Sequence, residues 1–278
     1  MTSMNYFNQK LSPFFKGSIL VLAGLFIGKL LAMANNVILA RYLHAHDYGV
    51  ILLGLSLFEL ANVPASSGVP SLLPKFIAEF RSKNQFNSIN DIFLISLGSC
   101  LILSFLIAIL VILSSNFIST IIFKVPELQS VLRILVFSIP LTVSSAIIIS
   151  MFRGYELVKP RVFIQDILFP LLKILAFYFL FYFGLKLSAA YWSFLLANMV
   201  VFIFLLILLQ KTFTLKFRFK VYTPDMNMHL IRLAWPMSLQ SLLVIIYSQI
   251  DRVCLGYFLP PHYVGIYGAA YSITSMLI

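Results

Sequence analysis

The sequence predicts an all-α integral membrane protein, a polytopic bundle of transmembrane helices. Of its 278 residues, 61% are hydrophobic and 10% are charged, whereas soluble domains contain about 45–50% apolar and about 25% charged residues. Apolar runs repeatedly reach the length of about 20 residues that a helix needs to cross a bilayer. Inside a bilayer the backbone must satisfy its own hydrogen bonds, which favours helices. A soluble globule and a disordered chain are both excluded.

The apolar runs predict eight spans in two unequal parts. A six-helix first lobe is expected over residues 1–210, a basic cytoplasmic linker over 211–229, and the first two helices of a second lobe over 230–278. The first-lobe spans are expected at 17–39, 49–68, 91–113, 129–151, 162–183 and 187–210. Residues 69–80, which contain Pro70 and Pro74, should continue the second span along the membrane interface. The seventh span is expected at 230–259, and the eighth begins at His262.

The distribution of Lys and Arg predicts the orientation. With a cytoplasmic N-terminus, thirteen of these residues lie on the inner side and five on the outer side, and cytoplasmic loops are enriched in Lys and Arg. The formal net charge of +11 suits anionic lipids and anionic ligands. Nucleic acid is not an expected partner, because the basic residues are spread over several short loops without a reader motif.

The residue pattern disfavours an enzyme, a metal site and a bound cofactor. No nucleophile elbow or phosphate-cradling glycine loop stands in a suitable context. His44 and His46 lack further ligands, and Cys100 and Cys254 both lie in apolar segments without a metal-ligand spacing. We therefore expect no catalytic residues, no metal and no cofactor.

A weak internal repeat links the two parts of the chain. Shifting the sequence by 216 positions aligns identical residues, among them Leu43 with Leu259, His46 with His262, Gly49 with Gly265 and Ser56 with Ser272. An even number of crossings separates the first and seventh spans, so the repeat is parallel. Transporters built from two like bundles have such repeats, related by an axis along the membrane normal.

The same regions carry a family resemblance. The first turn contains Leu39-Ala40-Arg41-Tyr42-Leu43 and Asp47-Tyr48-Gly49, and the second-half pattern contains Gln249-Ile250-Asp251-Arg252 and Val264-Gly265-Ile266-Tyr267. With these motifs the chain resembles the polysaccharide (lipid-linked oligosaccharide) flippases of the multidrug/oligosaccharidyl-lipid/polysaccharide exporter superfamily. Members of that family have two helical lobes around a central cavity. Against this pattern the chain ends within its eighth span, so we expect a C-terminally truncated member.

The resemblance implies a function, a location and partners. The expected protein is a bacterial inner-membrane transporter that moves lipid-linked (polyprenyl-diphosphate) oligosaccharide repeat units to the outer leaflet, for lipopolysaccharide O-antigen or capsule synthesis. Its expected partners are the lipid-linked oligosaccharide, membrane lipids and the polysaccharide polymerase machinery. Two alternatives stay open: a multidrug or ion-coupled exporter of the same superfamily, and an inactive truncated membrane fragment.

Polar residues inside the spans are the candidate binding groups, because a charge there costs about 2.5–3.5 kcal/mol on insertion scales. Lys29 and Asn36 are two helical turns apart on one face of the first span and are expected to point into a cavity. Alternatively, Lys29 snorkels to the interface. Asp166 and Lys173 have the same spacing in the fifth span, with Pro170 expected to kink the helix between them.

The remaining candidates have equally plain structural explanations. Arg41 and Arg252, with Asp251, are expected to complete a cationic cavity for the sugar-diphosphate head. Alternatively, Asp251 and Arg252 serve helix packing, through an ion pair of Asp251 with Arg41 or Arg133. Glu59 and Asp166 are candidates for ion coupling, although Asp166 could instead pair with Lys159 or Arg161. An inner-mouth basic cluster is expected to attract the diphosphate, and positive-inside bias explains it equally well. The cluster consists of Arg153, Lys159 and Arg161.

Overall fold

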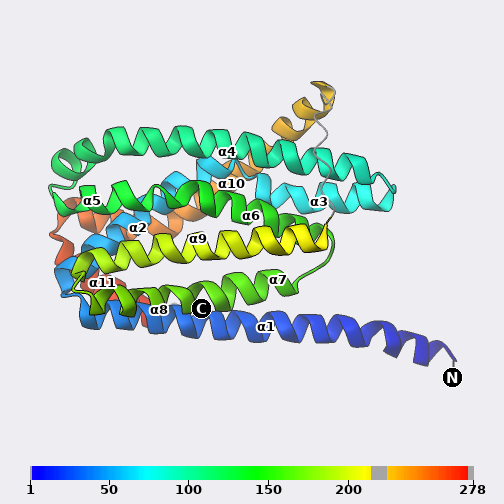
Figure 1. Cartoon of the computed structure of the whole chain (residues 1–278), viewed down its shortest axis with the longest axis horizontal. Helices are drawn as coiled ribbons and strands as arrows, with labels where there is room; N and C mark the ends of the chain where they lie inside the picture. The colour runs from blue at the N-terminus through cyan, green and yellow to red at the C-terminus, as the bar shows by residue number, and fades with distance from the viewer. Residues whose placement is uncertain (1, 214–223, 275–278) are drawn as a thin grey trace.

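The computed structural model describes the backbone of residues 2–213 and 224–274, and the side chains of residues 21–213, 235–272 and 274. The described residues form long helices that run roughly along one direction (Figure 1). Seven of the described helical segments are long and apolar enough to cross a membrane. The all-α membrane bundle predicted from composition is therefore confirmed.

The helices of residues 2–212 overlap the six spans predicted there, and several extend beyond them. They are α1 (Thr2–Tyr42), α2 (Ala45–Ser66), α3 (Val69–Ser82), α4 (Phe86–Phe117), the π-helix η1 (Ile118–Ile122), α5 (Glu127–Leu135), α6 (Ser138–Gly154), α7 (Lys159–Arg161), the π-helix η2 (Val162–Leu168), α8 (Phe169–Tyr182) and α9 (Lys186–Thr212). The predicted fourth span is two helices, α5 and α6, which together form one membrane-length segment.

The second part consists of α10 (Pro224–Phe258) and α11 (Pro261–Thr274). Helix α10 begins six residues before the expected end of the linker, since 224–229 are already helical, and α9 continues to Thr212. The alternating apolar and basic stretch at 215–221 lies outside the described residues, as do the last four residues of the predicted eighth span.

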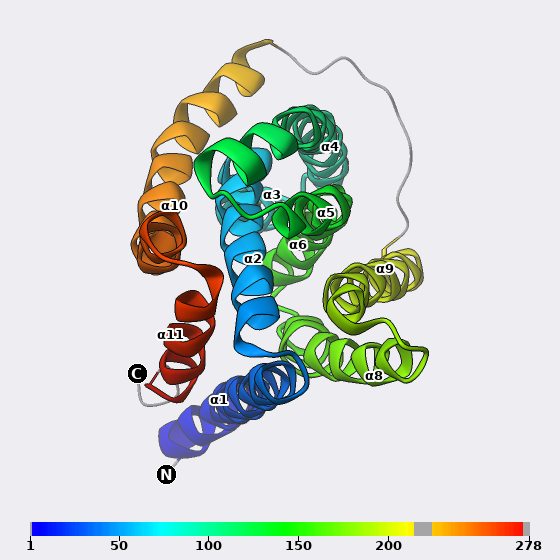
Figure 2. The same cartoon turned by 90° about the vertical axis from the view of Figure 1, so that its left-hand side faces the viewer.

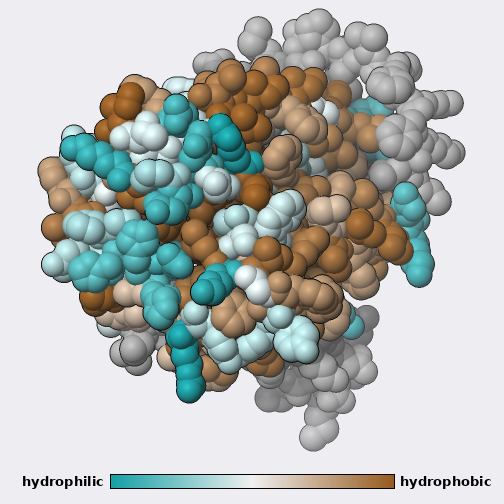
Figure 3. Space-filling view, turned by 60° about the vertical axis from the view of Figure 1, so that its left-hand side comes forward, coloured by the Kyte–Doolittle hydropathy of each residue, from teal (hydrophilic) through white to brown (hydrophobic). Residues whose placement is uncertain are grey.

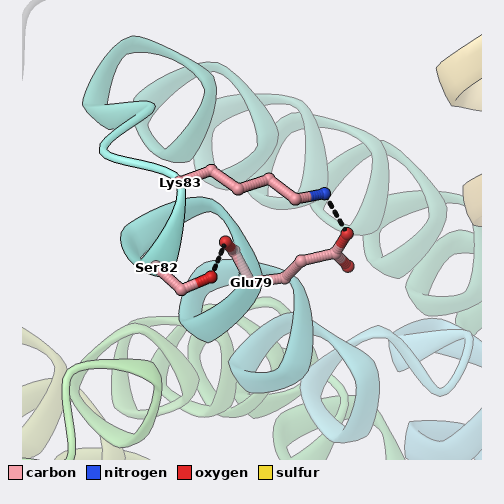
Figure 4. A network of polar contacts seen from close by, with 3 residues as sticks. All are labelled: Glu79, Ser82 and Lys83. Atoms are coloured by element: carbon pink, nitrogen blue, oxygen red, sulfur yellow. Dashed lines mark hydrogen bonds and ion pairs between the residues drawn. The ribbon is translucent and has the colours of Figure 1, made fainter.

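A left-handed break separates α2 from α3. Ser67 and Gly68 have φ angles of 49° and 65°, and Pro64 and Pro70 flank them in the sequence. Two consecutive residues in this region end a right-handed helix, so α3 leaves α2 as a separate helix. Its far end is closed by Glu79, whose carboxylate accepts a hydrogen bond from Lys83 Nζ at 2.7 Å and whose backbone carbonyl accepts one from Ser82 Oγ at 2.7 Å (Figure 4).

Helix α2 occupies the centre of the bundle. Viewed along the helices, it lies between α10 and α11 on one side and α5, α6 and α9 on the other (Figure 2). Its buried side chains include Tyr48, Leu53 and Phe58. By contrast, α4 presents much of its apolar surface outward, and Leu113 is 78% exposed. Such outward surface is what a lipid-facing helix requires.

The surface of the molecule matches this arrangement. In the space-filling view hydrophobic residues cover most of the side of the bundle, and hydrophilic residues gather at the left of the view, toward the end of the bundle that is at the left of Figure 1 (Figure 3). Hydrophobic sides with polar ends are the pattern of a protein whose helices cross a bilayer from end to end.

The internal repeat reappears as a reciprocal contact between α2 and α11. A Cβ atom added to Gly49 would collide with the Pro261 carbonyl oxygen, and one added to Gly265 would collide with the Ala45 carbonyl oxygen. Gly49 aligns with Gly265, and Ala45 with Pro261, under the 216-residue shift. Each contact is thus the counterpart of the other, which is the relation expected about a pseudo-two-fold axis.

Candidate functional site

A polar cavity of about 350 Å³ lies between α1 and the η2–α8 segment. It brings together four residues singled out from the sequence: Lys29, Asn36, Asp166 and Lys173. The other lining residues are Leu25, Gly28, Ala32, Asn35, Gln165, Phe169 and Pro170. We call this the α1–α8 cavity. The spacing argument, which put Lys29 with Asn36 and Asp166 with Lys173 on shared faces, therefore selected side chains that do meet at one place.

Two glycines on α1 let the cavity walls approach closely. A Cβ atom added to Gly28 would come within 2.7 Å of the Asp166 carbonyl oxygen, and one added to Gly24 would collide with Val162. Glycines four residues apart allow helix backbones to pack tightly in membranes. This contact fixes the first turns of η2 against α1 and sets Lys29, next to Gly28, at the rim of the cavity.

The fifth span adopts a π-helix just before Pro170. Seven residues, Val162–Leu168, have this wider turn, where the sequence had predicted a proline kink. Pro170 lacks an N–H to donate to its own helix, and a π-turn is one way in which a helix accommodates a local irregularity, often at a functional site. The irregular turn contains Asp166, whose Oδ2 is buried without a hydrogen-bond partner.

Lys173 on α8 is a half-buried cation of the cavity. Its Nζ lies 5.5 Å from the centroid of the Phe194 ring on α9, a distance at which a cation is attracted to the ring face. Its charge also interacts with that of Glu59 on α2, although the two do not form an ion pair within 4.0 Å in the described part of the chain. Lys173 thus connects the cavity to Glu59 inside the bundle.

Asn36 joins the two parts of the chain. Its Nδ2 donates to Ser272 Oγ on α11 at 3.1 Å. Under the 216-residue shift Ser272 corresponds to Ser56 and Asn36 to Arg252. Ser56 Oγ on α2 donates to Gln249 Oε1 on α10 at 2.9 Å, and the same oxygen accepts from Arg252 Nη1 at 3.2 Å. Polar contacts therefore link α1 to α11 and α2 to α10.

Arg41, Asp251, Arg252 and Glu59 do not line the α1–α8 cavity. Arg41 is exposed at the end of α1. Asp251 is exposed and accepts a hydrogen bond from the Tyr267 hydroxyl at 2.7 Å, and Arg252 stacks 5.1 Å from the Tyr271 ring centroid. The expected ion pair of Asp251 with Arg41 or Arg133 is absent from the ion pairs of the described residues. Contacts within α10 and between α10 and α11 engage Asp251 and Arg252 instead.

The inner-mouth basic cluster is partly assembled. Arg153 at the end of α6 and Arg161 in α7 lie close enough for their charges to repel, and Arg161 also interacts electrostatically with Asp166. Lys159 is exposed on the same short helix. The described residues contain no ion pair within 4.0 Å between Asp166 and Lys159 or Arg161, so the Arg161 charge acts on Asp166 only through space.

Aromatic and charged residues close the bundle next to this cluster. Phe213, the last described residue after α9, packs its ring against Phe152 and Tyr155, and Arg81 at the end of α3 lies 5.6 Å from the Tyr155 ring centroid. Burial raises the pKa of the Tyr155 hydroxyl, and the Arg81 charge opposes this shift. Arg81 also reaches Glu156 at 4.0 Å. These contacts hold the ends of α3, α6 and α9 together.

Sequence reasoning missed several residues of the site. Asn35 and Gln165 are polar neighbours of Asn36 and Asp166 and were detectable as polar residues within spans. Gly28 and Phe194 carried no such signal, because a glycine or a phenylalanine in an apolar helix is unremarkable until its packing partner is known. No group of three or more potential ligands for a metal ion occurs in the described residues.

Comparison with known proteins identifies the fold and the family. A family model described as "Polysaccharide biosynthesis protein" matches residues 14–278. No curated protein sequence matches the chain. Two solved structures resemble it, one named "protein A" with a TM-score of 0.68 and the MATE multidrug transporter DinF-BH with a TM-score of 0.63. Each is 14% identical to this protein in sequence. Each match covers 94% of this chain and 60% of the chain in the solved structure.

At this identity the solved structures show the shared fold, and the chain spans less than two thirds of their length. The family model, by contrast, matches nearly the whole chain. Together with the seven membrane-length helices, it shows that this multi-pass membrane protein belongs to the polysaccharide biosynthesis protein family.

Proposed function

We propose that the chain is the substrate-binding first lobe, with the start of the second, of a transporter that moves lipid-linked (polyprenyl-diphosphate) oligosaccharide units from the cytoplasmic to the outer leaflet of a bacterial inner membrane. The α1–α8 cavity carries this proposal. Its two lysines, Lys29 and Lys173, come from different helices and converge with amide side chains inside a lobe of a polysaccharide biosynthesis family member.

The chemistry of the cavity fits an anionic sugar head group. Ammonium groups bind phosphate oxygens through charge-assisted hydrogen bonds, and Asn35, Asn36 and Gln165 offer donors and acceptors for sugar hydroxyls. The basic cluster of Arg153, Lys159 and Arg161 would meet the diphosphate first at the inner mouth. In this proposal the N-terminus is cytoplasmic. The polysaccharide polymerase machinery then uses the lipid-linked oligosaccharide that has reached the outer leaflet.

Asp166 and Glu59 are proposed to couple transport to an ion gradient. The unpartnered Oδ2 of Asp166 faces a cationic cavity, and Glu59 interacts with the charge of Lys173. Proton binding to either carboxyl would change the positive charge available to the substrate. Asp166, the acidic residue of the cavity lining, also supports the second candidate function, a multidrug exporter, since acidic lining suits cationic compounds and one similar structure is a multidrug transporter.

The test is complementation of a bacterium that lacks its own oligosaccharide flippase, with surface polysaccharide as the readout. The 278-residue chain is compared with a form extended through any continuing reading frame, and each carries Lys29→Ala or Lys173→Ala. Lys186→Ala, at the start of α9 and outside the cavity, is the matched control. We expect restored polysaccharide with the control and loss with both cavity variants. If polysaccharide is restored regardless of both lysines, the cavity does not bind the head group. Drug resistance without polysaccharide would favour the exporter.

A further inference from the structure

A second cavity, of about 620 Å³, lies at the seam between the first lobe and α10. Its walls come from the α2–α3 break, the middle of α4 and residues 235–242 of α10. We call it the seam pocket. Its lining residues are Val63, Pro64, Ser67, Val69, Leu72, Leu73, Phe76, Ile95, Ser96, Ser99, Cys100, Leu103, Trp235, Ser238, Leu239 and Leu242. None of them carries a formal charge.

Three polar side chains of the wall formed by α2–α4 donate to nearby backbone carbonyls. Ser67 Oγ donates to the Pro64 carbonyl at 3.2 Å, Ser99 Oγ to the Ser96 carbonyl at 3.2 Å, and Cys100 Sγ to the Ser66 carbonyl at 3.5 Å. The donors of these three side chains are therefore engaged. What the pocket offers an occupant is mainly hydrocarbon surface from Leu72, Leu73 and the other apolar side chains, and its volume falls in the range of about 300–1,000 Å³ found for ligand pockets.

The depth of the pocket matches one leaflet of a bilayer. Trp235 lies at one end of the α10 wall of the pocket, and tryptophan concentrates at the level of the lipid head groups. From Trp235 to Leu242 the helix rises by about 10 Å, and from Ile95 to Leu103 by about 12 Å. Half of a hydrocarbon core is about 15 Å. The pocket thus starts at the interface and ends before the middle of the membrane.

We propose that the seam pocket binds one acyl chain of a membrane phospholipid, from the leaflet at the α3 end of the bundle. An apolar cavity does not hold ordered water. On the α10 side two lining residues, Trp235 and Leu239, are 69% and 46% exposed, on a helix that is long and apolar enough to cross a membrane. The α1–α8 cavity shares no lining residue with it. The pocket is therefore separate from the proposed head-group site, and its depth fits a chain confined to one leaflet.

The consequence is a lipid wedged between the first lobe and the first helix of the second. Close backbone packing bounds the pocket where Gly68 meets α10: a Cβ atom added to Gly68 would come within 2.6 Å of the Ser238 backbone nitrogen. An acyl chain beside this contact would fill the space between α4 and α10 that protein atoms leave open.

The test uses the whole chain with Trp192→Phe, which leaves Trp235 as its one tryptophan. The protein is reconstituted in nanodiscs of phosphatidylcholine and phosphatidylglycerol with brominated acyl chains, which quench tryptophan fluorescence. After transfer to detergent and washing, retained lipid is identified and counted by native mass spectrometry. Ser99→Phe and Leu239→Phe fill the pocket from opposite walls. Gly98→Phe is the control, because Gly98 does not line the pocket and a Cβ there meets no atom within 4 Å.

In the parent and in Gly98→Phe we expect one retained phospholipid and quenched Trp235 fluorescence. In both pocket-filling variants we expect about tenfold weaker retention of phospholipid, which corresponds to about 1.4 kcal/mol of lost binding free energy. Equal retention in all four proteins would overturn the proposal. So would retention of a lipid-linked saccharide in place of phospholipid, or a protein dimer in which a second copy shields Trp235 from the brominated chains. If one pocket-filling variant does not insert into the membrane, the other variant decides the test.

Discussion

At the scale of single residues, Lys173 is the side chain on which the proposed function depends most. It lines the α1–α8 cavity, lies over the Phe194 ring and interacts with Glu59. The sequence selected it as a charge inside a span. The structure adds the reason why a cation is tolerated there, since an aromatic face and a carboxylate offset part of the cost of leaving water.

We expect Lys173→Met to weaken substrate binding by about 1.5–3 kcal/mol, the range of a hydrogen bond to a charged group, which is about tenfold to a hundredfold in affinity. Uptake of a lipid-linked oligosaccharide by proteoliposomes, measured against substrate concentration, reports the change. Lys173→Arg keeps the charge and should retain more transport than Lys173→Met. Equal activity of the two variants would show that the charge is not used.

A second prediction concerns the hydrogen bond between Asn36 and Ser272. The test is a double-mutant cycle with Asn36→Ala, Ser272→Ala and the two combined. We expect a coupling energy of about 0.6 kcal/mol and no more than about 1.7 kcal/mol, the range measured for interhelical hydrogen bonds in membranes. Reversible unfolding in mixed detergent micelles measures it. Additive effects of the two substitutions would mean that the 3.1 Å contact contributes nothing to the association of α1 with α11.

At the scale of helices, the crossing of α2 and α11 depends on the absence of side chains. Gly49 and Gly265 each face a backbone carbonyl of the other helix, and Gly268 faces Leu52 in the same interface. Small residues let membrane helices approach closely and gain van der Waals contact. The repeat found in the sequence therefore marks residues that pack against each other.

Gly49→Ala and Gly265→Ala should each destabilise the protein by about 1–3 kcal/mol, the usual cost of overpacking, because the added methyl group meets backbone that cannot rotate away. Thermal unfolding in detergent measures the loss. Gly98→Ala, in open space on α4, should leave the melting temperature unchanged or raise it slightly, since alanine is the better helix former. Similar melting temperatures for all three variants would contradict a tight crossing.

At the scale of the whole molecule, the two cysteines report the arrangement of the bundle in the membrane. Cys254 is exposed near the end of α10, and Cys100 is buried beneath the α2–α3 break. In cells, a membrane-impermeant maleimide added from outside should label Cys254 and spare Cys100, if the N-terminus is cytoplasmic. Cys254→Ser should abolish the labelling. Labelling of Cys254 only in inverted vesicles would reverse the orientation expected from the distribution of Lys and Arg.

The sequence by itself determined that the chain is a membrane helix bundle, where most of its spans lie and which family it resembles. Hydropathy, span length and motif spacing are properties of consecutive residues, so they can be read along the chain. The same local reasoning paired Lys29 with Asn36 and Asp166 with Lys173, because each pair shares a helix face. All four line one cavity.

Only the tertiary structure decided which helix faces meet. Gly28 packs against Asp166 and so brings α1 to η2, whereas Arg41 and Arg252, expected in the same cavity, lie outside it. In a bilayer, lipid is as apolar as the helices, so hydrophobicity does not choose between neighbours. Close packing of small residues and a few hydrogen bonds make that choice, and these depend on contacts between residues far apart in the sequence.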